Sequence, residues 1–107
     1  MEIIELIRVI KNTNNREFNN ACGELIRRTC RWINPNVRLK DSIFTQICHK
    51  YHINESPDSV NDIFSIYNDS MATIINNIKF GELDEIQSLN DFKIYSKRIC
   101  ANFCKEF

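Results

Sequence analysis

Cysteine and histidine side chains are the most reactive groups in this sequence. Cys48, His49 and His52 lie close together in the chain, and Cys100 and Cys104 are four residues apart. Spacings of three or four place side chains on one side of a helix, where imidazole and thiolate groups can share a metal ion. Two ligands do not make a site. A metal centre therefore requires a fold that brings the two cysteine-containing segments together.

The alternative role for these side chains is structural. Helical cysteine is commonly a small buried hydrophobe, and histidine on a helix is often a polar surface group. The sequence has no cysteine in a recognisable nucleophile context, and it lacks phosphate-loop, zincin and EF-hand motifs. The sequence thus favours the structural role, and it predicts no catalytic residue, no metal ligand, no cofactor and no enzymatic activity.

A cluster of arginine side chains is the second candidate binding feature of the sequence. Arg27, Arg28 and Arg31 fall on one side of a predicted helix, beside Trp32. They could form an anion-binding ridge for nucleic acid or an acidic partner. The interpretation that the sequence favours is a solvated helix face with intrahelical ion pairs to Glu24.

Composition limits the classes of protein to which the chain can belong. Its 107 residues suit a single domain, and 43% hydrophobic with 26% charged residues is typical of a globular protein. Fourteen basic and fourteen acidic side chains cancel, which removes a global attraction to nucleic acid. Any contact with DNA must therefore come from a local basic patch.

Cysteine usage and hydropathy indicate the compartment. The five cysteines are an odd number without paired spacing, and no secretory leader precedes them. We therefore expect reduced thiols and a cytoplasmic protein. Charged residues or asparagine interrupt every apolar run well before the roughly 18 to 20 residues that a membrane span requires, so no membrane partner is expected.

The spacing of apolar residues predicts an all-α fold. Only two Gly and two Pro interrupt the chain, and apolar positions recur at intervals of three and four. We expect a compact bundle of four to five helices. The expected helical ranges are 1–11, 16–33, 43 to about 54, 57–79 and 89–107.

Capping and helix-breaking residues set these boundaries. Gly81 is expected to end the long helix with its freedom for positive φ. Ser88 and Asp91 form a variant capping box in which Asp replaces the usual Glu or Gln. The other signals are the polar break at 12–15, the Asn34-Pro35 stop, Asp41 as an N-cap, and Ser56-Pro57 as an N-cap followed by proline.

Four helices have predicted core faces. The face on the helix from 43 to about 54 carries Ile43, Phe44, Ile47, Cys48 and Tyr51. The face on 16–33 carries Phe18, Cys22, Leu25, Ile26, Thr29, Trp32 and Ile33. The face on the long helix carries Val60, Ile63, Phe64, Tyr67, Met71, Ile74 and Ile78. The face on the last helix carries Leu89, Phe92, Tyr95, Ile99, Phe103 and Phe107.

The residue order of the last helix goes beyond amphipathicity. Residues 92–107, FKIYSKRICANFCKEF, resemble the third helical segment of region 2 in bacterial sigma-70-type factors, which reads roughly F-K-x-W-x-Y-R-I-A-R-N-x-x-x-D-Y. Matching or similar positions are Phe92, Lys93, Tyr95, Arg98, Ile99, Asn102, Glu106 and Phe107.

The resemblance extends back through the long helix. Residues 62–78, DIFSIYNDSMATIINNI, follow without a gap the family pattern D-A-E-D-V-V-Q-E-V-F-L-K-L-W-E-N-I, mostly by residue type. Asn68-Asp69 stand where Gln-Glu is usual, and Ser65 replaces an acid. The resemblance covers about residues 40–107, is closest to the extracytoplasmic-function type, and leaves residues 1–35 without an assigned role.

The resemblance implies two binding faces. In the family, the long helix docks on the clamp helices of the RNA polymerase β′ subunit, which assigns polymerase binding to Ser65, Asn68, Asp69 and Thr73. The last helix faces −10 promoter DNA, which assigns DNA binding to Lys93, Tyr95, Lys97, Arg98, Asn102 and Lys105. An anti-sigma-like protein is a further implied partner.

The same residues also fit a competing class of function. A polar face on the long helix is equally typical of solvated surface, and Tyr95 falls on the apolar period of its helix. The alternative is a small all-helical interaction protein, such as a viral or mobile-element modulator of a host complex, that binds protein and no DNA.

Overall fold

The computed structural model describes residues 2–32, 43–53, 59–81 and 86–106. These residues form α1 (Ile3–Asn12), α2 (Arg16–Thr29), the short 3-10 helix η1 (Cys30–Trp32), α3 (Ile43–Lys50), α4 (Ser59–Phe80) and α5 (Leu89–Glu106). Every described element is helical, which confirms the prediction of an all-α bundle. The predicted boundaries at Asn34-Pro35, Asp41 and Ser56-Pro57 lie outside the described residues.

Local structure sets both ends of α2. Asn15 caps α2, where its side chain accepts a hydrogen bond from the Glu17 N–H at 3.3 Å. The α-helix ends at Thr29, earlier than predicted, and continues as one 3-10 turn to Trp32. The tighter turn buries Trp32, of which 3% is exposed.

Gly81 ends α4 for a reason that differs from the prediction. Its φ is not positive. Its N–H donates to the Asn77 carbonyl at 2.7 Å, and a Cβ at this position would lie 2.5 Å from that oxygen. Glycine is therefore required by a close backbone approach and not by a left-handed conformation.

The N-terminus of α5 carries the predicted cap in a modified form. Ser88 Oγ accepts a hydrogen bond from the Asp91 N–H at 3.1 Å, as expected for an N-cap. The Asp91 carboxylate accepts a longer hydrogen bond of 3.3 Å from the Gln87 N–H, one residue before the cap. The reciprocal bond of a capping box thus forms one residue earlier than the usual pattern.

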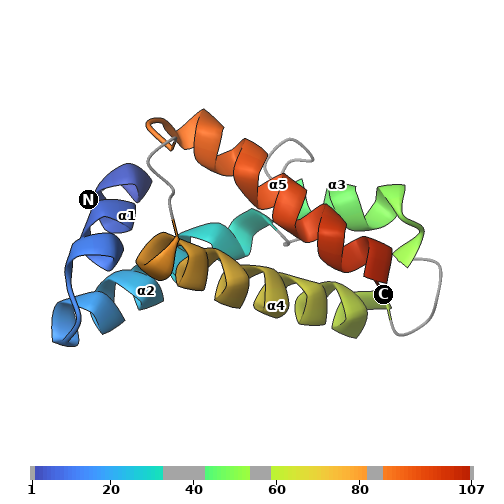
Figure 1. Ribbon diagram of the computed structural model, residues 1–107. Helices are drawn as coiled ribbons and strands as arrows, with labels where there is room; N and C mark the ends of the chain where they lie inside the picture. The colour runs from blue at the N-terminus through green and yellow to red at the C-terminus, as the bar shows by residue number, and fades with distance from the viewer. Residues whose placement is uncertain (1, 33–42, 54–58, 82–85, 107) are drawn as a thin grey trace.

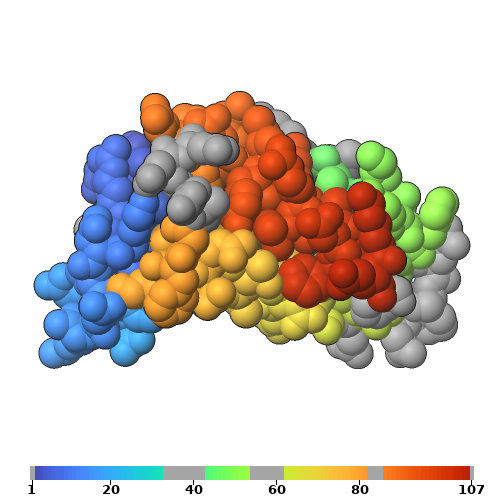
Figure 2. Space-filling view, viewed as in Figure 1, coloured from blue at the N-terminus to red at the C-terminus, as the bar shows by residue number. Residues whose placement is uncertain are grey.

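The two longest helices, α4 and α5, run antiparallel and carry the rest of the bundle (Figure 1). At one end α1 packs against α2 and α4, and at the other α3 packs against α5 and α4. The two ends of the chain lie at opposite ends of a body that measures 41 × 26 × 24 Å. The surfaces of α4 and α5 adjoin along the face shown in Figure 2.

An aromatic cluster joins four of these elements in the core. Trp32 of η1 stacks on Phe44 of α3, with ring centroids 5.9 Å apart, and lies 5.7 Å from Phe92 of α5. Phe44 in turn meets Tyr67 of α4 edge to face at 5.4 Å. Such pairs contribute stability beyond the apolar area that they bury.

The buried face of α5 is rotated from the predicted one. Its buried residues are Phe92, Ser96, Cys100 and Cys104. Tyr95, Ile99 and Phe103 flank this line and are half-buried, while Phe107 lies outside the described residues. The helix packs between α3 and α4, and small side chains on its central line let both neighbours approach.

Three apolar residues from the predicted core faces lie at the surface. They are Ile26 of α2, Phe64 of α4 and Leu89 of α5, with exposed fractions of 41%, 49% and 44%. Each sits at the edge of its apolar stripe, and polar or small residues take the buried positions instead. Among these are Ser70 of α4 and Ser96 of α5, which are both fully buried.

Candidate binding faces and a buried cysteine cluster

The polar face of α4 is open to solvent at three of its four predicted positions. Ser65, Asn68 and Asp69 are exposed, and Thr73 is half-buried. The buried residues of α4, from Ile66 to Ile78, lie on the opposite side of the helix, so the polar face points to solvent. The structure therefore brings an amide and a carboxylate together on one accessible helical surface.

An apolar side chain adjoins this polar face. Phe64 is 49% exposed and precedes Asn68 by four residues, which places the two side chains on the same side of α4. Half-exposed aromatic residues next to polar groups are enriched in protein–protein interfaces. Sequence reasoning placed Phe64 in the core because it falls at the margin of the apolar stripe.

The predicted DNA-binding residues of α5 are mostly accessible. Lys97, Arg98, Asn102 and Lys105 are exposed, and Lys93 is half-buried. Arg98, Asn102 and Lys105 lie on the side of α5 that faces away from its buried line of residues 92, 96, 100 and 104, whereas Lys93 and Lys97 flank that line. This local positive surface is the kind of patch that a neutral chain needs in order to contact phosphate groups.

Tyr95 has a structural setting that differs from those exposed residues. Its ring is half-buried and packs against the core, and its hydroxyl accepts a hydrogen bond of 2.7 Å from Asn77 Nδ2 on α4. The residue ties α5 to α4 in this conformation. Stacking of the ring on a base would require both contacts to be given up.

An open hollow of about 860 Å³ lies between the start of α1, the end of α2 with η1, and the start of α5. Four of its lining residues are basic, namely Arg27, Arg28, Arg31 and Lys93, and Trp32 lies at its wall. Lys93 thus belongs both to this hollow and to the predicted DNA-binding helix. The family resemblance assigns no role to the three arginines. They extend the positive surface of α5 toward α2.

Glu24 partly neutralises this hollow. Its carboxylate accepts hydrogen bonds from Arg27 Nε at 2.9 Å and from Arg28 Nε at 2.9 Å. These hydrogen bonds lower the pKa of Glu24 below its ordinary value. The expected intrahelical pairing is confirmed for Arg27 and Arg28, and both guanidinium groups remain substantially exposed.

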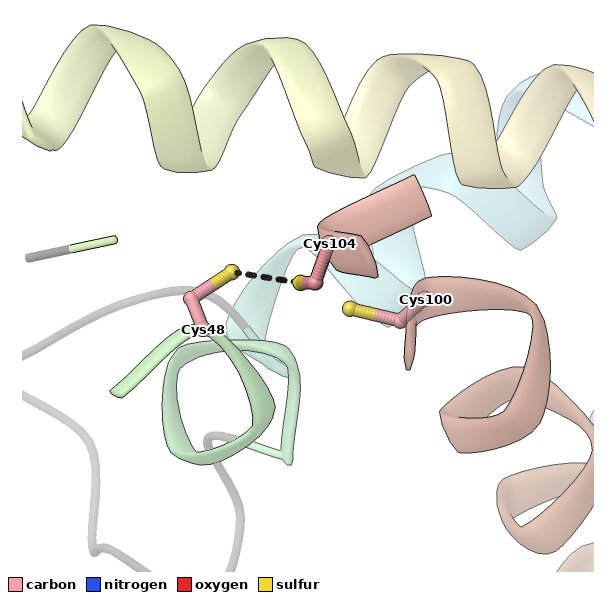
Figure 3. Close-up of side chains that lie close together, drawn as sticks. All are labelled: Cys48, Cys100 and Cys104. Atoms are coloured by element: carbon pink, nitrogen blue, oxygen red, sulfur yellow. Dashed lines mark hydrogen bonds between the residues drawn. The ribbon is translucent and has the colours of Figure 1, made fainter. Parts of the chain in front are cut away.

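Three cysteine sulfurs converge between α3 and the second half of α5 (Figure 3). The Sγ atoms of Cys48, Cys100 and Cys104 all lie within 4.8 Å of one another, and Cys48 and Cys104 are 3.9 Å apart. Cys48 and Cys100 are fully buried, and 6% of Cys104 is exposed. The fold therefore supplies the juxtaposition that a metal centre requires.

The thiols of this cluster influence each other's ionisation. Hydrogen bonds with Cys104 and Cys48, together with burial, raise the pKa of Cys100. Hydrogen bonds from Cys100 and Cys48 lower the pKa of Cys104, because they stabilise its thiolate. The least buried sulfur is thus the first to become a thiolate, and its two neighbours act as donors.

The histidines do not join the cluster. The α3 helix ends at Lys50, and His52 follows in a turn with a φ of 62°, so His49 and His52 do not share one helical side as predicted. Both side chains are exposed. The metal-binding potential of the described residues therefore lies with the three buried thiols and not with the His pair.

The remaining cysteines are Cys22, which is half-buried, and Cys30, which is exposed. All five cysteines are free thiols in the structure. The i, i+4 spacing of Cys100 and Cys104 was the available sequence signal for the cluster. The contribution of Cys48 depends on a contact across 56 positions of the chain, which local periodicity does not predict.

Among the described helices, none combines the length and apolar character needed to cross a bilayer. Comparison with known proteins found no matching family, no similar curated protein and no similar solved structure.

Proposed function

We propose that this protein acts by noncovalent binding as a sigma-region-2-like domain, which docks on the RNA polymerase core through the β′ clamp helices and contacts −10 promoter DNA. One arrangement carries the proposal. Asn68 and Asp69 are exposed on α4, and Lys97, Arg98 and Asn102 are exposed on the adjoining α5. The two faces that the sequence resemblance assigns are thus available on neighbouring helices.

Docking on polymerase would use the α4 face. The Asp69 carboxylate can accept charge-assisted hydrogen bonds from arginine side chains on the clamp helices, and Asn68 can donate and accept through its amide. Phe64, exposed on the same side, can supply an apolar anchor. Polar contacts of this kind give orientation and specificity more than raw affinity.

DNA contact would use the basic surface of α5 and the arginine-lined hollow. Lys97 and Arg98 can bind phosphates directly, and Lys93 connects them to the hollow formed with Arg27, Arg28 and Arg31. Asn102 can hydrogen-bond a base or a phosphate. Because the net charge of the chain is zero, this binding should be local and sensitive to salt.

A pull-down with bacterial RNA polymerase core, and separately with the isolated β′ clamp helices, tests the docking step. Wild-type protein should be retained, and the Asn68→Ala/Asp69→Ala variant should be lost. The matched control is Glu17→Ala/Asn20→Ala, which removes one exposed acid and one exposed amide from α2 and should leave retention unchanged. Equal retention of both variants, or none of wild type, would contradict the proposal.

A salt titration of single-stranded −10 oligonucleotide binding tests the DNA step. Each phosphate contact contributes roughly 0.7 to the slope of log affinity against log salt, so Lys97→Ala/Arg98→Ala should reduce the slope by about 1 to 1.5. The control Arg8→Ala/Lys50→Ala removes two exposed positive charges from α1 and α3 and should leave the slope unchanged. Identical slopes for all three proteins would exclude these phosphate contacts.

A second candidate is a protein-interaction module that binds no DNA. The observation that favours it is the set of exposed large apolar residues Phe64, Phe80 and Ile94, with exposed fractions of 49%, 79% and 49%. The two assays separate the candidates. A protein of this class would bind neither the clamp helices nor the −10 oligonucleotide.

A further inference from the structure

The cysteine cluster serves none of the binding contacts proposed above. Its three sulfurs point into the interface between α3 and α5, away from the exposed faces of α4 and α5 (Figure 3). Three buried cysteines acting only as small hydrophobes have no need to direct their sulfurs at one point. This convergence indicates that the three sulfurs share a ligand.

The dimensions of the cluster suit a single metal ion. A metal–sulfur distance of about 2.3 Å places sulfurs around one ion roughly 3.8 to 4.0 Å apart. Cys48 and Cys104 already meet this distance at 3.9 Å, and all three sulfurs lie within 4.8 Å of one another. A small inward movement of the sulfurs would complete the triangle without a change in the helices.

We propose that Cys48, Cys100 and Cys104 bind one thiophilic d10 metal ion, Zn²⁺ or Cu⁺. Soft thiolate ligands select these ions over Mg²⁺ or Ca²⁺. On binding, three S–H bonds break, three metal–sulfur bonds form, and three protons pass to solvent. Cu⁺ is satisfied by the three sulfurs, whereas Zn²⁺ takes a fourth ligand, which solvent would have to supply beside Cys104, the one sulfur of the three that is not fully buried.

The site would act as a cross-link within the fold. It joins α3 to the last turns of α5 across 56 positions of the chain, so metal binding would stabilise the contact between these helices. The inference does not rest on the proposed transcription function, because it concerns buried residues that polymerase and DNA would not touch.

Metal titration of the reduced 107-residue chain, prepared without metal and with a phosphine reductant, tests the proposal. Co²⁺ reports thiolate ligation through its charge-transfer absorption, Zn²⁺ should displace it at one ion per chain, and a Cu⁺ competition with a colorimetric chelator in the absence of oxygen distinguishes the two ions. A metal at 100 times its Kd should raise the melting temperature by roughly 10 °C or more.

Cysteine variants locate the site. Cys100→Ser should abolish the Co²⁺ absorption and the melting shift, while the control Cys30→Ser, at an exposed position outside the cluster, should retain both. Circular dichroism checks that each variant is folded. Unchanged metal binding by folded Cys100→Ser, or loss of binding by Cys30→Ser, would overturn the assignment.

A second measurement on wild-type protein needs no variant. Alkylation followed by peptide mass spectrometry should show that the metal slows modification of Cys48, Cys100 and Cys104 but leaves that of Cys30 unchanged. Equal rates with and without metal would overturn the proposal. So would oxidation to a Cys48–Cys104 disulfide in a protein whose reduced form takes up no metal.

Discussion

At the scale of single residues, Ser96 is a buried hydroxyl without a hydrogen-bond partner among the described residues. An unpaired buried hydroxyl costs about 1 to 3 kcal/mol, and alanine is also the better helix former. Ser96→Ala should therefore raise the free energy of unfolding by about 1 kcal/mol in urea denaturation.

The matched control is Ser70→Ala, since Ser70 is equally buried but donates to the Ile66 carbonyl at 2.6 Å. Its substitution removes a satisfied hydroxyl and should give no such gain. Destabilisation by Ser96→Ala would show that the hydroxyl has a partner in solution.

Tyr67 provides the converse case of a buried hydroxyl that is fully used. Its OH donates to the Ile26 carbonyl at 3.0 Å and lies 3.0 Å from Thr29 Oγ1, which links α4 to α2. Tyr67→Phe keeps the ring and removes these bonds, so the free energy of unfolding should fall by about 1 kcal/mol. Chemical denaturation measures it, with Tyr51→Phe as control because the Tyr51 hydroxyl has no partner among the described residues. If both variants lost the same free energy of unfolding, the hydrogen bonds of the Tyr67 hydroxyl would not account for the loss.

Residue-level chemistry was only partly predictable from the sequence. The i, i+4 pair Cys100 and Cys104 and the arginine pairing with Glu24 are local relations, and helical periodicity was sufficient to identify them. Cys48 was expected on an apolar face and is buried, but Ser96 was not recognised as a core contact, because a small polar side chain carries a weak hydrophobic signal. The burial of Ser96 is imposed by neighbouring helices rather than by its own type.

At the scale of elements, the end of α4 depends on a close approach at Gly81. A Cβ at this position would lie 2.5 Å from the Asn77 oxygen, so Gly81→Ala must displace backbone and should lower the free energy of unfolding by about 1 to 3 kcal/mol. Thermal or urea denaturation measures this loss.

Gly23→Ala is the matched control within α2. A Cβ at Gly23 meets nothing within 4 Å, and alanine in an exposed helix interior gains about 0.8 to 1.0 kcal/mol over glycine. The two Gly→Ala substitutions should thus have opposite signs. If both substitutions raised the free energy of unfolding, the end of α4 would accommodate a Cβ at Gly81 without loss of stability.

The order and most of the ends of the helices were accessible from sequence, because apolar spacing and caps such as Asn15 and Ser88 are local signals. The orientation of each helix about its axis was less accessible. The last helix was expected to bury Ile99 and Phe103, yet it buries Ser96 and Cys100 at the centre of its face. The shapes of α3 and α4 decide this rotation, so the sequence of α5 alone does not predict it.

At the scale of the whole molecule, the long-range arrangement brings together what the sequence could only place separately. The cysteine cluster joins segments 56 positions apart, and the basic hollow combines the ends of α2 and η1 with the start of α5. Neither juxtaposition follows from periodicity. Both depend on α4 and α5 packing antiparallel, with α1–α2 and α3 at opposite ends.

The aromatic cluster predicts how the molecule unfolds. Trp32 is the single tryptophan, and through Phe44, Phe92 and Tyr67 its surroundings involve η1, α3, α4 and α5 together. Its fluorescence therefore reports the tertiary core, while far-ultraviolet circular dichroism reports all helices. We expect the two urea transitions to coincide, because α1 and α2 have too little core of their own to remain folded alone.

Phe44→Ala should move both transitions to lower urea by the same amount, since it removes a fully buried ring at the centre of the cluster and costs about 3 to 5 kcal/mol. Ile94→Ala, at an exposed position of α5, should move neither by more than about 0.5 kcal/mol. If fluorescence were lost before helical signal, the α1–α2 end would be a separate folding unit. The polar face of α4, the basic surface of α5 and the cysteine cluster would then sit in a body whose stability does not depend on that end.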